Sequence, residues 1–165
     1  MFHEDSKAKD TIVFMHENAG NIGLRMDWFK LAYERLDVNI VAVAYRGYSR
    51  STGTPTEEGL LRDAEAMVNF CKQETRINQK RVFALGRSLG GAVAIHTLAK
   101  MAKQSNPSTL DKITGEDDCY FRGLIIENTF SSISDMADTL FGFLKWIPNI
   151  KAKMLKLNWN SEEQI

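Results

Sequence analysis

The sequence predicts an α/β fold: a doubly wound parallel sheet with helices on both faces. Four short apolar runs, rich in Val and Ile, are typical of strands that are buried on both faces of a parallel sheet. The runs are TIVFM (11–15), NIVAVAY (39–45), RVFALG (81–86) and RGLIIEN (122–128). Longer amphipathic segments separate them, and this alternation favours right-handed crossovers and an open sheet.

The connecting segments have the residue spacing of helices. In the first segment, apolar residues three or four positions apart define one face: Met26, Phe29, Tyr33 and Leu36. The third helix is expected to begin just after Ser88 and to run through Leu98. The polar stretch 104–118 that follows is expected to be a surface loop.

The second helix has a start signal and a continuous apolar stripe. Thr54 can cap this helix, Pro55 suits its first position, and Glu57 would complete a capping box. The stripe consists of Leu60, Ala64, Met67 and Cys71.

Length and composition exclude several classes of protein. The chain has 165 residues, which suits a single domain, and its 21 Lys plus Arg balance 21 Asp plus Glu without a basic block for nucleic acid. Cys71 and Cys119 lack metal-ligand spacing, so we expect reduced thiols and no metal or cofactor. No apolar run approaches the ~18 residues of a membrane span, and no signal peptide is recognisable. A cytoplasmic or membrane-associated protein is therefore expected.

A candidate nucleophile stands where the third strand meets its helix. Gly86-Arg87-Ser88-Leu89-Gly90 matches the G-x-S-x-G nucleophile elbow, in which a tight strand-to-helix turn projects the serine hydroxyl. The glycines remove side chains that would collide with the neighbouring helix and strand. The Leu89 N–H points to where an oxyanion would form, and the helix N-terminus adds partial positive charge. The alternative is a glycine-rich turn with an incidental serine, but the buried strand before it and the Ala- and Gly-rich helix after it favour the elbow.

A second oxyanion donor is expected in the loop after the first strand. The segment from His16 to Asn21 follows TIVFM directly. Because sites in open parallel sheets gather at the carboxyl ends of the strands, this loop and the serine turn should share one edge. The candidate donor is Asn18, through its backbone N–H.

Four motifs, taken together and in order, carry a resemblance to a known family. They are HENAGNIG (16–23), AYRGYSRSTGTPTEEG (44–59), GRSLGGAVAIH (86–96) and IIENTFSSISDMADTLF (125–141). With these motifs the chain resembles the α/β-hydrolase superfamily from about Thr11 to Ile165. Within it, the chain is most similar to the group around alpha/beta hydrolase domain-containing protein 13, which is related to the protein-depalmitoylating hydrolases.

The resemblance implies a serine hydrolase that cleaves an ester or thioester through an acyl-enzyme, without a cofactor. A small acyl ester or an acylated protein, such as a palmitoyl-protein thioester, would be the substrate. Ser88 would be the nucleophile, and the backbone N–H groups of Asn18 and Leu89 would form the oxyanion hole. The four strands would be the third to sixth of the family's eight, in the spatial order fourth, third, fifth, sixth. Residues 1–165 would then be a single domain that is incomplete at both ends.

Three residues depart from the family's pattern. Glu17 and Ser49 stand where the family usually has Gly, and Ala44 stands where it usually has Asp. A glycine permits backbone angles that Glu adopts only at a cost, and a carboxylate beside a developing oxyanion is unfavourable. Glu17 therefore bears on the oxyanion hole, whereas Ala44 and Ser49 bear on loop geometry.

The remaining triad members, an Asp and then a His in the family's order, have no counterpart in this chain. The histidines are His3, at the terminus, His16, which is expected to hold the oxyanion loop, and His96. His96 follows Ser88 by eight residues on one helix, about 12 Å along the axis, and is expected to point away from the serine turn. The family's acid is expected one strand after RGLIIEN, where the chain stops.

Two interpretations from different classes therefore stay open. In the first, the chain is the core of a serine hydrolase whose remaining strands it lacks. In the second, it is a catalytically inactive binding or scaffold protein with the same fold. We expect the 165-residue chain alone to be inactive or nearly so, because without a base the hydroxyl stays protonated and weakly nucleophilic.

Two segments suggest interaction surfaces. Beyond the core (11–134) lies an apolar, cap-like segment (135–160). It is either a helix pair packed on the core with its lysines in solvent or a cap that touches a membrane surface through residues 136–157. The strand 122–128 would be an exposed sheet edge, and such edges favour self-association.

Overall fold

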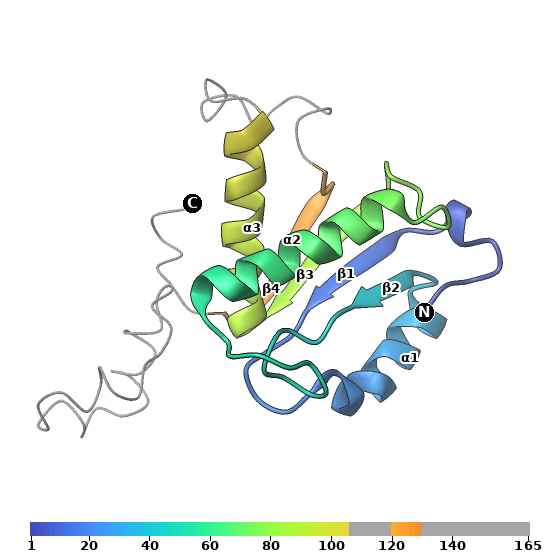
Figure 1. The fold of residues 1–165 in the computed structure, drawn as a ribbon. Coiled ribbons are helices and arrows are strands. Elements are labelled where there is room, and N and C mark those ends of the chain that lie inside the picture. Colours follow the sequence, from blue (N-terminus) through green and yellow to red (C-terminus); the bar gives the residue numbers. More distant parts are fainter. Residues whose placement is uncertain (106–119, 130–165) are drawn as a thin grey trace, which may run out of the picture.

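The computed structural model describes residues 1–105 and 120–129. Within these ranges the chain forms a four-stranded parallel sheet in the order β2-β1-β3-β4 (Figure 1). The strands are β1 (Thr11–Met15), β2 (Asn39–Ala42), β3 (Val82–Arg87) and β4 (Gly123–Glu127). The predicted fold class and strand order are therefore confirmed. The cap-like segment 135–160, Cys119 and most of the polar loop lie outside the described residues.

Helices cover both faces of this sheet. The described helices are α1 (Met26–Arg35), α2 (Glu57–Gln73), α3 (Leu89–Ser105) and the short 3-10 helices η1 (Ser6–Ala8) and η2 (Ile22–Arg25). Side chains alternate along β1, so that Val13 and Met15 join a core with α2 and α3, whereas Ile12 and Phe14 join a second core with α1. Figure 1 shows α2 and α3 on one side of the sheet, with α1 beyond β2.

The strand register brings the predicted site segments to one edge. Met15, the last residue of β1, pairs with Gly86 of β3, and Arg87 pairs with Glu127 of β4. The loop after β1, the turn after β3 and the end of β4 therefore meet at the carboxyl edge of the sheet, as sites in open parallel sheets do.

Several local predictions are confirmed and others are wrong. The predicted stripe of α2 is buried throughout: Leu60, Ala64, Met67 and Cys71. The cap, however, is Thr56, whose Oγ1 accepts the Gly59 N–H (3.1 Å). Thr54 and Pro55 precede the helix, because Thr56 has the extended backbone that a cap requires (φ −128°, ψ 157°).

The end of β2 and the buried face of α1 also differ from the prediction. β2 ends at Ala42 rather than Tyr45, and the Tyr45 N–H donates to a histidine ring instead of to a neighbouring strand. In α1, Met26 and Leu36 are exposed, because they lie at the two ends of the helix, and Phe29 and Ala32 are buried.

The two outer strands of the described sheet, β2 and β4, differ in how far they are shielded from solvent. Beside β2, Met1 exchanges two backbone hydrogen bonds with Ile40 (2.7 and 2.9 Å). On β4, Ile125 and Ile126 are 49% and 40% exposed. The apolar side chains of β4 are thus more accessible than those of the inner strands, and self-association through this strand stays a prediction.

Candidate active site

Ser88 occupies a strained turn between β3 and α3. Its φ is +52°, a left-handed conformation that side-chain-bearing residues rarely adopt. β3 ends one residue before it and α3 begins one residue after it. A short, strained strand-to-helix connection of this kind is typical of a nucleophile elbow. The geometry of the turn therefore agrees with the elbow prediction.

The glycines around Ser88 are required by close backbone approach. A Cβ on Gly86 would lie 2.4 Å from the Gly90 carbonyl oxygen, and a Cβ on Gly90 would lie 1.9 Å from the Met15 carbonyl oxygen. Neither backbone neighbour could yield to relieve these contacts. The first turn of α3 therefore packs directly onto the end of β1 and brings the elbow next to the predicted oxyanion loop.

The end of β4 holds the elbow from the other side. The Ser88 N–H donates to the Glu127 carbonyl (2.9 Å), and the Thr129 hydroxyl donates to the Ser88 carbonyl (2.8 Å). The Arg87 guanidinium lies 3.4 Å from the Glu127 carboxylate. The contact of Thr129 was not predicted from the sequence. Thr129 follows the run RGLIIEN, and a polar residue at the end of a strand next to β3 could have indicated a contact with Ser88.

His16 fixes the start of the predicted oxyanion loop. Its ring is buried and stacks on Tyr45, with centroids 4.2 Å apart. Nε2 accepts the Tyr45 N–H (3.2 Å), so the proton belongs on Nδ1, which donates to the Glu17 carbonyl (2.7 Å). Burial lowers the pKa of His16 to about 4, so the ring is neutral at pH 7. The expected role of His16 in holding the loop therefore has a structural basis.

Glu17 and Ser49, two of the departures from the family's pattern, behave differently. Ser49 has a φ of +53°, a conformation that favours glycine, whereas Glu17 is not among the described residues with positive φ. The backbone strain expected at Glu17 is thus absent. Its buried carboxylate forms an ion pair with the Arg25 guanidinium, at the end of η2.

Asn18 is exposed, in the loop between Glu17 and η2. Its side-chain oxygen accepts a hydrogen bond from the Tyr48 hydroxyl (2.5 Å). This contact links the loop after β1 to the loop after β2. The contact involves the Asn18 side chain, so the role of its backbone N–H in an oxyanion hole stays a prediction, as does that of Leu89.

The three histidines of the chain lie at different places in the fold. His3 lies near the start of β2, where its N–H bonds to the Asn39 side chain (3.1 Å), at the opposite end of the strands from Ser88. Both ring nitrogens of His16 are engaged in the loop. His96 lies two turns along α3. The absence of a triad base from the chain stays a prediction.

Cys71 is a free, buried cysteine in the described part of the chain. Burial, followed by the nearby Glu74 carboxylate, raises the pKa of the Cys71 thiol to about 12, so this cysteine is a poor nucleophile. In residues 1–105 and 120–129, no group of His, Cys, Asp or Glu could hold a metal ion. No helix in the same ranges is both long and apolar enough to cross a membrane.

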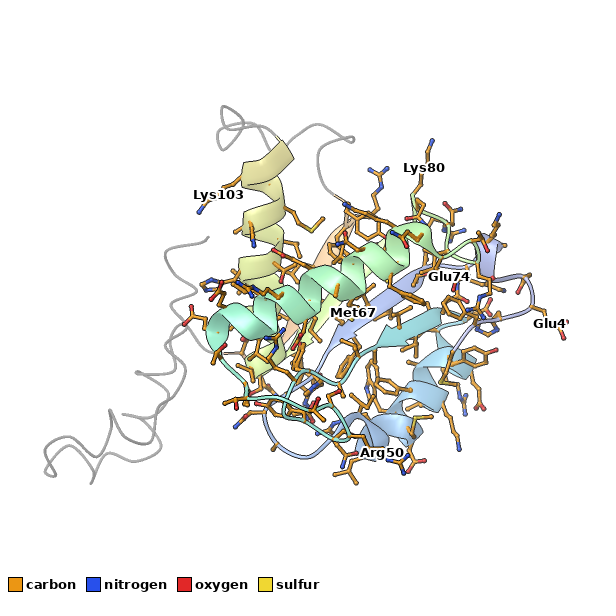
Figure 2. All side chains as sticks on the ribbon, viewed as in Figure 1. Glu4, Arg50, Met67, Glu74, Lys80 and Lys103 are labelled. Atoms are coloured by element: carbon orange, nitrogen blue, oxygen red, sulfur yellow. The ribbon has the colours of Figure 1, made fainter. Side chains whose placement is uncertain are left out.

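A cavity of about 870 Å³ lies away from Ser88. It is lined by β2, the loop that follows β2, and α2, and it includes neither Ser88, Leu89 nor Asn18. Figure 2 shows two of its lining residues, Met67 on α2 and Arg50 on the loop. Arg46 and Asp63 also line this cavity, where they form a two-pronged ion pair (2.8–3.1 Å).

The parallel sheet, its helices and the strained serine define an α/β-hydrolase fold, of which the described residues contain part. Comparison with protein families places residues 10–163 in the family described as Chlamydia CHLPS protein (DUF818). The chain belongs to this family. The resemblance to the α/β-hydrolase superfamily is confirmed by its relatives of known sequence and structure.

The most similar relatives include two eukaryotic proteins. The chain is 40% identical to the alpha/beta hydrolase domain-containing protein WAV2 of Arabidopsis thaliana, over 89% of this chain and 43% of that protein. It is 32% identical to protein bem46 of Schizosaccharomyces pombe, over 98% of this chain and 48% of that protein. The chain therefore spans about half the length of these relatives.

Among solved structures, the fold is similar to that of an alpha-beta hydrolase from Vibrio vulnificus, with a TM-score of 0.70 at 22% identity. The match covers 93% of this chain and 51% of the Vibrio chain. This similarity shows the fold alone, and it agrees with the partial fold that the sequence predicts.

Proposed function

We propose that Ser88 is the nucleophile of a serine hydrolase that cleaves an ester or a thioester through an acyl-enzyme. The observation that carries this proposal is the left-handed backbone of Ser88 (φ +52°) between β3 and the N-terminus of α3. Such strain persists only where the surrounding structure enforces it, and it gathers at functional sites. Here Glu127, Thr129 and the close-packed glycines enforce it.

The proposed reaction is acyl transfer. The Ser88 oxygen attacks the carbonyl carbon, the alcohol or thiol departs, and water later releases the acid. The oxyanion would accept hydrogen bonds from the backbone N–H groups of Leu89 and Asn18, aided by the N-terminus of α3. The hydroxyl proton must pass to a base. Since the three histidines are placed elsewhere, the chain alone should react slowly.

The substrate class is an acyl ester or an acylated protein, including a palmitoyl-protein thioester. This finer assignment rests on the resemblance to hydrolases of lipid-modified proteins. Contact with a membrane surface through residues 136–157 would suit such substrates. Those residues lie outside the described ranges, so that contact stays a prediction.

A second candidate, a catalytically inactive binding or scaffold protein, is favoured by one observation. His16 is locked in its neutral form by two hydrogen bonds, and His3 lies at the other end of the sheet. If the protein is inactive, the turn at Ser88 has only a structural role, and the Ser88 hydroxyl is no more reactive than that of other serines.

Chemical rescue with imidazole separates the two candidates. A fluorophosphonate probe should label Ser88 slowly in buffer, and added imidazole should speed labelling at least about tenfold by supplying the missing base, since a positioned base contributes 10²–10⁴. The Ser88→Ala variant is the control and should show no rescue at this peptide. Labelling that is no faster at Ser88 than at surface serines, with imidazole present, would favour the inactive protein.

A further inference from the structure

Glu17 presents an unusual problem for the loop after β1. Glu17 is only 6% exposed, and both of its carboxylate oxygens are buried without a hydrogen-bond partner among the described residues. A buried carboxylate without a compensating cation is strongly destabilising. The Arg25 guanidinium supplies that cation. The carboxylate is therefore directed to a specific partner eight residues later.

The position of Arg25 gives this ion pair a geometric consequence. Arg25 is the last residue of η2 and the N-cap of α1, which packs on the sheet through Phe29. Glu17 directly follows His16, which is anchored to Tyr45. The ion pair thus connects the residue after His16 to the start of α1, so both ends of the loop 18–24 are held together.

Between these two points the loop is exposed and has few other restraints. Residues 18–20 are all exposed. The Asn21 side chain accepts the Gly23 N–H (2.9 Å), and the Tyr48 hydroxyl contacts Asn18 (2.5 Å). The Glu17–Arg25 pair joins a buried carboxylate to a partly exposed guanidinium, and removing Arg25 would leave that carboxylate uncompensated.

We propose that the Glu17–Arg25 ion pair is a positioning pair that holds the loop after β1, so that the Asn18 N–H faces the oxyanion formed at Ser88. This inference rests on the proposed serine-hydrolase function. It also reverses the expectation for Glu17: the carboxylate is neutralised by Arg25 and orders the oxyanion hole rather than opposing it.

Amide hydrogen exchange tests the ordering directly and does not depend on Ser88 chemistry. In Glu17→Gln, Glu17→Gly and Arg25→Gln, exchange of the Gly23 and Leu24 amides, which donate to Asn21, should rise at least about tenfold, while amides of α2 change by less than about twofold. Arg25→Lys keeps the charge and should restore most of the protection. Glu58→Gln, which breaks the exposed Glu58–Arg62 pair, is the matched control and should leave the loop unchanged.

A second readout separates positioning from mere stability. With imidazole present, the maximal rate of fluorophosphonate labelling at Ser88 should fall about tenfold or more in Glu17→Gln and Arg25→Gln, with the probe concentration for half-maximal rate unchanged. Arg25→Lys should recover most of this rate. The proposed mechanism requires this pattern because the pair acts on the oxyanion donor and not on probe binding.

Each outcome has a distinct meaning. Unchanged loop exchange, or an equal rise in α2, overturns the positioning pair even if Ser88 labels well. Faster labelling in Glu17→Gly also overturns it, because the carboxylate would then oppose the oxyanion. If Ser88 labels in no variant, the serine-hydrolase proposal fails, and the exchange pattern still decides whether the pair orders the loop.

Discussion

Acidification below pH 6.5 is expected to destabilise this fold through His16. The ring is buried, and its two nitrogens donate to the Glu17 carbonyl and accept from the Tyr45 N–H. Protonation of Nε2 would remove its acceptor and place a charge in the core. Burial lowers the pKa of His16 from 6.5 to about 4 in the folded chain. Because the unfolded chain binds the proton more readily, stability falls as the pH falls.

The magnitude follows from the two pKa values. The contribution of His16 is fully present above pH 6.5, and linkage gives a loss of ~2 kcal/mol by pH 5 and ~3 kcal/mol by pH 4. This is a large fraction of the 5–15 kcal/mol that stabilises a typical domain. The loss should be almost complete just below pH 4, where the folded protein also takes up the proton.

Urea unfolding at pH 7, 6, 5 and 4 measures this loss against a matched variant. His16→Phe keeps an aromatic ring on Tyr45 but has no titratable nitrogen. It is expected to be less stable than the wild type at pH 7, and the difference should shrink by ~2 kcal/mol by pH 5. Carboxylates that titrate in this range contribute equally to both proteins. Parallel pH dependences in the two proteins would refute the reasoning.

Three further predictions concern the backbone and the sheet edge. Ser49→Gly should raise stability by about 1 kcal/mol in urea unfolding, because Gly adopts the observed φ of +53° without strain; a loss of stability would contradict the strain argument. Gly90→Ala should destabilise by more than about 3 kcal/mol, because its Cβ would lie 1.9 Å from the Met15 carbonyl oxygen, and a thermal midpoint near that of the wild type would rule this packing out. The wild-type chain should self-associate in light scattering through the exposed β4 edge, and Ile125→Lys should lower its mean mass, whereas a monodisperse wild-type monomer would argue against such association.

The sequence was most informative where one local pattern decided the structure. The continuous Val- and Ile-rich runs predicted four strands, and the family resemblance supplied their order; the predicted burial on both faces is wrong for β4, where Ile125 and Ile126 are exposed. The elbow could be recognised because Gly86, Ser88 and Gly90 satisfy steric demands within one turn. The apolar stripe from Leu60 to Cys71 was equally clear, because one face of a helix buries it.

Features that depend on distant partners could not be predicted in the same way. Strand β2 ends before Tyr45 because the Tyr45 N–H donates to His16 instead of to a neighbouring strand. His16 directly follows β1, so the sequence near Tyr45 gives no sign of this partner. Thr54 and Thr56 are both suitable N-cap residues by sequence. Which of them caps α2 depends on the backbone path of the preceding loop, and Thr56 has the extended conformation of an N-cap. The partner of Glu17 lies eight residues away, with no helical or strand period to indicate it.

The central claim is that Ser88 accepts an acyl group, and intact-mass analysis tests it most directly. The chain would be incubated with a p-nitrophenyl ester or an acyl thioester in the presence of imidazole, with Ser88→Ala as the control. We expect one acyl addition, mapped to the peptide that contains Ser88, in samples quenched at early times, before imidazole-assisted hydrolysis releases the acyl group. Absence of the adduct, or an equal adduct in Ser88→Ala, would contradict the account.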